Sequence, residues 1–336
     1  MLQASTAVLR FVFLCAWGVA CVQSQGGQGC AMQCPTSEPY IAVEITTDDT
    51  FRNVATSTCP PYENPGWSNP NTACQADTTF NIPLLPKYAK VPIPVGEVES
   101  VFEDITYLKT DPAPVFGSLG VLKNGVNVFG VGSPCGFSSK CTDEGAPTDF
   151  VDAVESEGHT VDDCGGHADP MRNYHIHSGI GINSTEQREK CNLPADVPGE
   201  HSMLLGWMFD GFGLYGRYSQ GGLVPTDLDQ CHGHTHEIDG VMTYHYHLPD
   251  GFPWTIGCYK GCPEVSNNQN QLSYINSDPE FGCPDGLDED PDPLVEAAPM
   301  NTTEGTSTTD STVVGVTSLQ FISLAVLALC ALILGL

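Results

Sequence analysis

Basic residues are scarce in this chain: 12 Lys and Arg stand against 41 Asp and Glu among 336 residues, and the formal net charge is −29. Proteins that bind nucleic acid need clustered Lys and Arg to face the phosphates. We therefore exclude nucleic acid as a natural partner. The acidity is compatible with cation binding, calcium included, but an acidic surface also simply keeps secreted proteins soluble.

The motifs of several enzyme classes are also missing. Ser202 follows His201 but lies in no G-x-S-x-G nucleophile elbow. The stretch GSLGVLKNGVNVFGVG is glycine-spaced, yet it follows neither the phosphate-loop nor the dinucleotide pattern, and hairpin turns explain it. The sequence assigns no catalytic residue and leaves open whether the protein is an enzyme.

Both ends of the chain carry apolar runs. Arg10 precedes FVFLCAWGVACV, which predicts a secretory signal peptide over residues 1–24. Residues 311–336 end in a hydrophobic run without a basic residue behind it, after the small polar stretch NTTEGTSTTDST. This combination predicts a GPI-attachment signal with Ser307 as the attachment site; a single membrane span is the alternative. We expect an extracellular protein held at the cell surface by a lipid anchor, with unknown protein partners.

Cysteines and sequons fit this location. Cys15, Cys21 and Cys330 lie in the end segments, which leaves 12 of the 15 cysteines, and an even number in a secreted chain predicts disulfides. The candidates are Cys30, Cys34, Cys59, Cys74, Cys135, Cys141, Cys164, Cys191, Cys231, Cys258, Cys262 and Cys283. Connectivity stays open, although the short loops Cys30–Cys34, Cys135–Cys141 and Cys258–Cys262 are geometrically possible. Asn183 and Asn301 begin sequons and are predicted glycosylation sites.

Composition divides the mature chain into three parts. Residues 25–90 are rich in Cys and Pro and predict an irregular, cross-linked segment. Residues 91–265 hold short apolar runs between turn signals and predict one disulfide-stabilised, mainly β domain, sandwich-like or barrel-like. Residues 266–310 are expected to form an acidic and Ser/Thr-rich disordered linker, or stalk.

Within the main domain, four stretches predict local structure. The Asn-Gly pair at Asn124 favours a tight hairpin turn. DFVDAVESEG, from Asp149, predicts a short helix with a capping aspartate, and STEQREKCNLP, from Ser184, a second helix or an exposed loop. HSMLLGWMFDGFGLYGRY, from His201, is aromatic and interrupted by glycines, which favours bent strands.

The histidines follow a duplicated pattern. CGGHADPMRNYHIH ends at His177 and CHGHTHEIDGVMTYHYH ends at His247, and both read Cys, any residue, Gly, His, a loop, then Tyr-His-any-His. Residues two apart on a strand point to the same face, so each unit presents three imidazoles. We interpret this as an internal repeat of a turn and a strand.

Three neutral imidazoles suit a borderline metal ion. The sequence therefore predicts a zinc or copper site, with calcium as a further possibility for the acidic chain. The ligand candidates are His167, His175, His177, His234, His245 and His247, with His232, His236 and Glu237 as secondary candidates. Whether the two triads share one site stays open. The preceding cysteines are expected to fix each turn by a disulfide.

Three alternatives to metal binding remain. The histidines can form an acid/base pair or a pH sensor. In a cell-surface recognition module, the histidines would be structural and the aromatic block of Trp207, Phe209, Phe212 and Tyr215 would form the binding face. A calcium-associated acidic surface protein is the third alternative.

The blocks GVLKNGVNVFG, YHIHSG, HSMLLGWMFDGFGLYG and LDQCHGHTHEIDGVMTYHYHLPDGFPWTIGCYKG occur in this order. Together they resemble the YHYH-domain family over Phe116–Gly261. The family motif falls on Tyr244–His247, and its Asp-Gly aromatic block on Asp210–Gly216, where Gly213 replaces an expected proline. The resemblance implies a secreted or surface domain and no particular activity.

Overall fold

The computed structural model describes residues 31–63, 71–95, 117–134, 150–238 and 240–283. The predicted signal peptide, Asn301, Ser307, Cys30, Cys135 and Cys141 lie outside these ranges. The described part is mainly β, as predicted.

Its strands are β1 (Glu44–Thr47), β2 (Phe51–Thr56), β3 (Thr78–Pro83), β4 (Tyr88–Pro94), β5 (Ser118–Leu122), β6 (Asn127–Phe129), β7 (Gly132–Pro134), β8 (Phe150–Asp152), β9 (Gly166–Ala168), β10 (Tyr174–Ile176), β11 (Leu204–Met208), β12 (Gly213–Tyr215), β13 (Gly233–Ile238), β14 (Val241–His247) and β15 (Cys258–Gly261). The helices are α1 (Ala153–Glu157), α2 (Thr185–Lys190) and α3 (Gln269–Ser277), with 3₁₀ turns η2 (Gly158–Thr160), η3 (Gln220–Gly222) and η4 (Val265–Asn268). Within the described ranges, every helix is too short or too polar to cross a bilayer.

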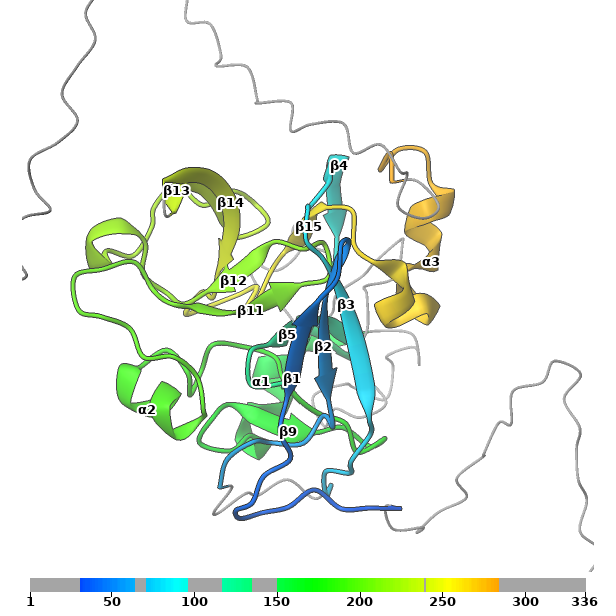
Figure 1. Cartoon of the computed structure of the whole chain (residues 1–336), viewed down its shortest axis with the longest axis vertical. Coiled ribbons are helices and arrows are strands. Elements are labelled where there is room, and N and C mark those ends of the chain that lie inside the picture. The colour runs from blue at the N-terminus through cyan, green and yellow to red at the C-terminus, as the bar shows by residue number, and fades with distance from the viewer. Residues whose placement is uncertain (1–30, 64–70, 96–116, 135–149, 239, 284–336) are drawn as a thin grey trace, which may run out of the picture. The chain divides into compact units, whose positions relative to one another are not determined.

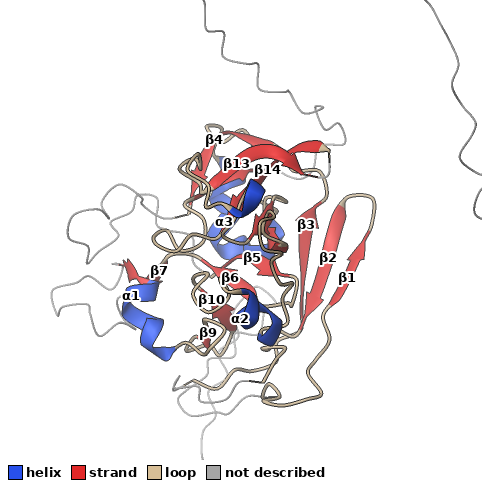
Figure 2. Cartoon of the chain, turned by 90° about the vertical axis from the view of Figure 1, so that its left-hand side faces the viewer, coloured by secondary structure: helices blue, strands red, loops and turns tan. Residues whose placement is uncertain are grey.

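The largest sheet of the described residues has eight strands, in the order β13-β14-β12-β11-β5-β6-β10-β9. Figure 2 shows β13 and β14 toward one end of this sheet and β9 and β10 toward the other. The sheet is open in the described residues, and a second sheet, β1-β2-β3, packs on it (Figure 1). The arrangement is therefore closer to a sandwich than to a barrel.

The large sheet consists of two equivalent halves. In the first half, hairpin β5–β6 is followed by hairpin β9–β10; in the second half, β11–β12 is followed by β13–β14. In each half the second strands of the two hairpins pair in parallel, β6 with β10 and β12 with β14, and the remaining pairs are antiparallel. The halves are thus related by a pseudo-two-fold axis between β5 and β11.

The sequences of the first hairpins support this relation. Leu119–Gly130 reads LGVLKNGVNVFG and Leu205–Gly216 reads LGWMFDGFGLYG. Gly125 and Gly211 occupy the same turn position with φ of 84° and 91°, a region that glycine adopts at little cost. The predicted Asn-Gly hairpin is confirmed, and the duplication extends well beyond the histidine segments in which it was first visible.

The axis passes between β5 and β11 at a point where their backbones lie close together. Gly120 of β5 and Gly206 of β11 hold equivalent positions there. A Cβ on Gly206 would lie 2.6 Å from the Cα of Leu122, and a Cβ on Gly120 would lie 2.6 Å from the carbonyl oxygen of Trp207. These positions have no room for a side chain.

We expect Gly206→Ala to destabilise the protein by about 3 kcal/mol or more, because the added methyl group must push β5 and β11 apart. Thermal or urea unfolding measures the change. Gly251→Ala is the matched control, since a Cβ there meets nothing within 4 Å. Equal unfolding free energies for Gly206→Ala and Gly251→Ala would contradict this prediction, because β5 and β11 could then move apart at little cost.

The Cys/Pro-rich segment, expected to be irregular, contributes β1, β2 and β3. The guanidinium of Arg52 lies 4.2 Å from the ring centroid of Trp207, and the ring of Phe80 lies 5.3 Å from that of Phe209. Val54 and Ile82 are fully buried. These strands are short and separated by turn residues, so composition averaged over the segment conceals them.

The chain also stays ordered beyond residue 265, where we expected the linker to begin. Leu272 and Ile275 of α3 are fully buried, and Cys283 is bonded to Cys262. The apolar positions of this short helix are interspersed with Asn, Gln and Ser, which are typical of a linker.

The described disulfides are Cys34–Cys59, Cys164–Cys191, Cys231–Cys258 and Cys262–Cys283, and Cys74 is also disulfide-bonded. The suggested short loops Cys30–Cys34 and Cys258–Cys262 are therefore wrong, since Cys34 and Cys258 have other partners. Cys164–Cys191 and Cys231–Cys258 both span 27 residues and occupy equivalent places in the two halves. The expectation that a disulfide fixes each histidine turn is confirmed.

Two further expectations are settled by burial and capping. Trp207, Phe209 and Phe212 are buried, and the half-buried Tyr215 packs against the rings of His201 and His245, so the aromatic block belongs to the core and is not a binding face. Both predicted helices form: α1 is capped by Asp152, three residues after the start we expected, and α2 is capped by Ser184.

Asp210 is a buried acid in the turn between β11 and β12. Its carboxylate accepts hydrogen bonds from the Tyr246 hydroxyl and from the backbone amides of Gly261, at 3.0 Å, and Phe212, at 3.3 Å. Burial raises the pKa of Asp210 from 3.8 to about 6, although these hydrogen bonds oppose the rise. Asp210 therefore stabilises the folded state more when its carboxyl group is protonated than when it is ionised.

Asp210→Asn supplies a pH test. A folded-state pKa above the unfolded value contributes stability that is full below pH 3.8 and is lost as pH rises through about 6. Asparagine does not titrate. The unfolding free energy of the wild type, relative to that of Asp210→Asn, should thus fall by about 2.4 kcal/mol from pH 4 to pH 7. Urea denaturation at both pH values measures it, and a constant difference would contradict it.

Candidate metal centres

Cluster A consists of His167, His175 and His177. His167 lies on β9 directly opposite His175 on β10, and His177 follows the end of β10. The Nε2 atom of His175 lies 3.0 Å from Nε2 of His167 and 2.9 Å from Nε2 of His177. All three side chains are buried.

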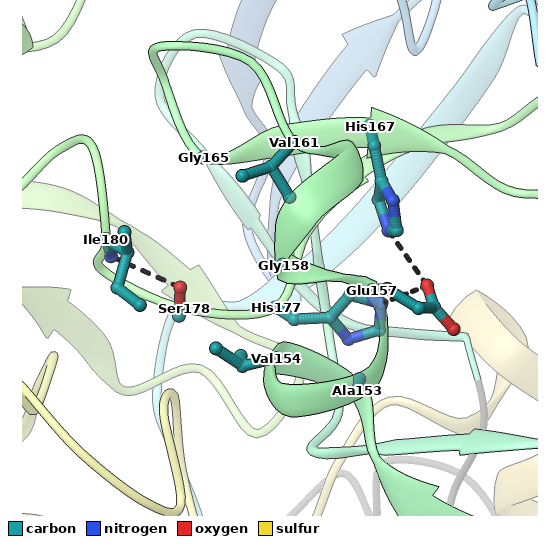
Figure 3. A pocket seen from close by; sticks show the side chains of 10 residues that line it. All are labelled: Ala153, Val154, Glu157, Gly158, Val161, Gly165, His167, His177, Ser178 and Ile180. Atoms are coloured by element: carbon teal, nitrogen blue, oxygen red, sulfur yellow. Dashed lines mark hydrogen bonds and ion pairs between the residues drawn. The ribbon is translucent and has the colours of Figure 1, made fainter. Parts of the chain in front are cut away.

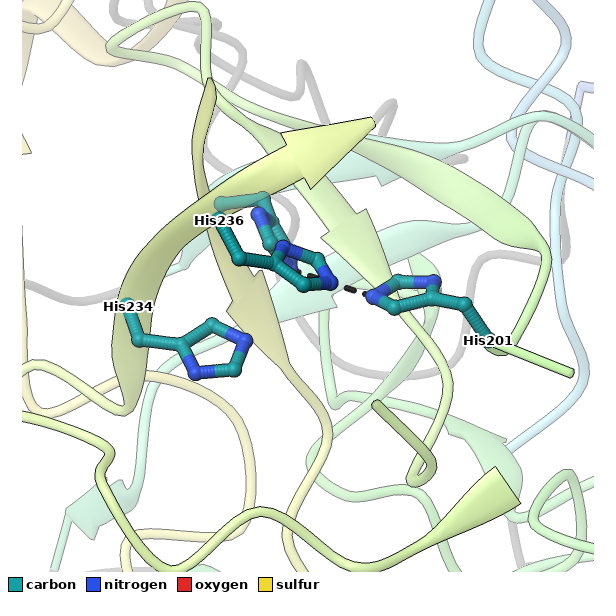
Figure 4. Close-up of side chains that lie close together, drawn as sticks. His201, His234 and His236 are labelled. Atoms are coloured by element: carbon teal, nitrogen blue, oxygen red, sulfur yellow. Dashed lines mark hydrogen bonds between the residues drawn. The ribbon is translucent and has the colours of Figure 1, made fainter. Parts of the chain in front are cut away.

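Cluster B consists of His201, His234, His236, His245 and His247. The first precedes β11, the next two lie on β13 and the last two on β14. Nε2 of His245 lies 3.2 Å from Nε2 of His201 and 3.1 Å from Nε2 of His247, which is 3.2 Å from Nε2 of His234. Figure 4 shows His201 reaching toward His236 and His234 from a separate segment.

Groups within each cluster meet the spacing that one ion requires. One ligand atom from each of His167, His175 and His177 lies within 4.8 Å of the others, and the same holds for His201, His234, His236 and His245. Two nitrogen donors bound to one ion at about 2.0–2.1 Å lie roughly 3 Å apart. The Nε2 separations in both clusters are close to this value.

Oxygen atoms hold the other ring nitrogen of each histidine in cluster A. Nδ1 of His175 lies 3.0 Å from the carbonyl of Asn173, and Nδ1 of His177 lies 2.7 Å from that of Gly130. Nδ1 of His167 lies 2.7 Å from Oγ1 of Thr160, which donates its own hydrogen to the carbonyl of Glu157. Since carbonyl oxygens only accept, each Nδ1 carries the hydrogen.

Cluster B repeats this arrangement. Nδ1 of His245 lies 3.0 Å from the carbonyl of Thr243, and Nδ1 of His247 hydrogen-bonds the carbonyl of Gly216 at 2.6 Å. Nδ1 of His201 lies 2.7 Å from the carbonyl of Ser202. Nδ1 of His234 lies 2.9 Å from the carboxylate of Asp227, a partner typical of metal-bound histidine.

Burial favours the neutral form of five of these imidazoles. Burial lowers the pKa of His167 and of His247 to about 3 and that of His245 to about 2, and it also lowers the pKa of His175 and His177. A neutral ring has one N–H, and Nδ1 has it, so Nε2 carries a lone pair. Lone pairs facing each other at about 3 Å repel, and a cation among them removes this repulsion.

The two clusters are separate. Four strands, β12, β11, β5 and β6, lie between β14 and β10 in the sheet. At about 4.8 Å per strand, the two clusters are on the order of 24 Å apart along the sheet. Two histidine triads therefore form two sites, not one shared site.

Two secondary candidates fall outside the clusters. His232 has φ of 66° at the turn position that Gly165 holds, with φ of 76°, in the first half. Glu237 is exposed and alternates along β13 with His234 and His236, so it faces the other way. The third candidate, His236, does lie in cluster B.

Sequence reasoning missed His201 and Glu157. His201 comes from the segment before β11, more than 30 residues from the other histidines of cluster B. Oε2 of Glu157 lies 3.2 Å from Nε2 of His167 and 3.9 Å from Nε2 of His177. Neither residue lies in a repeated motif, so the only available signal was its residue type.

The tyrosines of the two repeats face away from the histidines, and each contacts a half-buried aspartate. Asp162 accepts hydrogen bonds from the Tyr174 hydroxyl and from the amides of Cys164 and Gly166. Asp229 does the same with Tyr244 and the equivalent amides, and it also pairs with Nζ of Lys260 at 3.0 Å. Each aspartate closes the turn that positions the first histidine of its repeat, His167 or His234.

The second half can therefore tolerate the loss of its tyrosine hydroxyl better than the first. Tyr174→Phe leaves the half-buried Asp162 without its side-chain donor and should cost about 2 kcal/mol of unfolding free energy. Tyr244→Phe should cost about half as much, because Lys260 still pairs with Asp229. Chemical denaturation of both variants checks the order, and a reversed order would contradict it.

The sequon residue Asn183 lies just before α2 and is half-buried. Its Nδ2 donates to the carboxylate of Asp250 at 2.9 Å. Glycosylation at this residue stays a prediction.

The fold and the clusters define a disulfide-stabilised β domain with a duplicated histidine site. Residues 105–223 match the family model described as YHYH protein. The chain thus contains a YHYH domain, and the resemblance stated from its motifs is confirmed. The match spans cluster A and His201 and ends before β13 and β14, so the duplicated second half extends beyond it. No curated protein and no solved structure matches the chain.

Proposed function

We propose that this protein binds transition-metal ions at the cell surface, with one ion in each histidine cluster. The observation that carries the proposal is the convergence of Nε2 lone pairs at about 3 Å, with Nδ1 of each of seven imidazoles committed to an oxygen atom. Structural histidines would instead direct both ring nitrogens to separate partners.

Zinc or copper is the proposed metal, because imidazole nitrogen suits both ions. Calcium prefers six to eight oxygen ligands, which neither cluster supplies. The disulfides support an oxidising, extracellular location. The lipid anchor at Ser307 is part of the proposal and rests on the C-terminal sequence alone.

Metal analysis of the full chain, expressed through the secretory pathway of a eukaryotic host, tests the proposal. We expect two ions per chain, one in His175→Ala, one in His245→Ala and none in the double variant. His159→Gln, which changes an exposed histidine outside both clusters, should retain two. Removing the metal with a chelator should lower the melting temperature, since an ion at 100 times its Kd stabilises the fold by about 2.7 kcal/mol.

A protein without stoichiometric metal, whose melting temperature also stays constant when zinc or copper is added, would contradict the proposal. The histidines would then have a structural role. In that case His175→Ala and His245→Ala would still lower stability, with no change in metal content.

A further inference from the structure

The two clusters differ in their candidate metal ligands, although the strands and turns that carry their histidines are equivalent. Glu157, at the end of α1, directs Oε2 toward cluster A, while its Oε1 accepts a hydrogen bond from the buried Ser133. The first histidines of the two repeated motifs, His167 and His234, are 67 residues apart, and the same spacing places Val224 where the first half has Glu157. Cluster A therefore has a carboxylate beside three imidazoles, and cluster B has two extra imidazoles.

A cavity of about 40 Å³ adjoins cluster A. Figure 3 shows His167, His177 and Glu157 on one side of it, with Val154 and Ile180 among its other walls. This volume holds about three water molecules. Ile180 is 45% exposed, so the cavity reaches the surface there.

We infer that a metal ion in cluster A keeps one coordination position open toward this cavity and binds a small molecule of two to four non-hydrogen atoms there. Cluster B, with five imidazoles, has donors enough to close the shell of its ion. Three or four protein donors plus an open position are the arrangement of catalytic metal sites, and a closed shell is that of structural ones. This inference rests on the proposed function.

The apolar side chains that line the cavity limit which molecules can bind in it. Val154, Val161 and Ile180 offer no hydrogen bonds through their side chains, whereas Ser178 and Glu157 are polar. Such a cavity suits water, hydroxide, or a compact neutral or singly charged molecule, and it excludes peptides and sugars by size. The metal ion itself would be the main attraction for a small anion.

Azide, a three-atom anion, tests the open position in the full chain loaded with cobalt(II), whose visible spectrum reports coordination. Azide should shift the cobalt bands of His245→Ala, which retains cluster A, and leave those of His175→Ala, which retains cluster B, unchanged. In the His245→Ala background, Glu157→Gln should weaken cobalt binding at least about tenfold.

Gly158→Leu checks the cavity. Gly158 lines it with helical backbone angles, and a Cβ there meets only Val154, at 3.9 Å, so the larger side chain fits the backbone. In the His245→Ala background it should weaken azide binding at least tenfold and leave the cobalt content unchanged. Gly158→Ala is the graded control and should have a smaller effect.

Cobalt bound to His245→Ala without any azide response would overturn this inference and leave the proposed function in place. An equal azide response in His175→Ala would also overturn it, because cluster B would then be open as well. Absence of cobalt from every variant and from the wild type would overturn the proposed function together with the inference.

Discussion

The backbone contact between β5 and β11 is the constraint on which the other contacts of the domain depend. The strands meet at Gly120 and Gly206, where neither position has room for a side chain. This contact joins the two halves into one continuous sheet, and it places the histidine hairpins at opposite ends of that sheet. A two-fold axis perpendicular to the sheet also keeps equivalent side chains on one face, so both clusters lie on the same side.

The two halves share the same turn, disulfide and histidine orientation but add different residues, and this explains how one repeated unit forms two different candidate sites. Each half supplies an aspartate that closes a turn, a disulfide that spans 27 residues, and three imidazoles oriented through Nδ1. What differs is Glu157 from α1 in the first half and, in the second, His201 from before β11 and His236 on β13. The frame fixes where the nitrogen atoms point, and the added residues determine which chemistry is available.

The sequence predicted the parts of the fold that depend on local pattern. Alternation placed His245 and His247 on one face and Tyr244 and Tyr246 on the other, and the Asn-Gly pair predicted the turn at Asn124. Strand order was not predictable, because the pairing of β6 with β10 and of β12 with β14 depends on contacts far apart in the chain. For the same reason Glu157 and His201 gave no signal, and only the fold brings them to the clusters.

The distance between the two clusters affects how they would bind metal ions. The clusters lie about 24 Å apart along the sheet, and no described histidine belongs to both, so the two candidate sites share no ligand. Under the proposed function, each ion would then bind through its own set of donors, and a metal titration would follow the sum of two simple isotherms. With five imidazoles in one cluster and three beside a carboxylate in the other, the two proposed sites would differ in the metals that they favour.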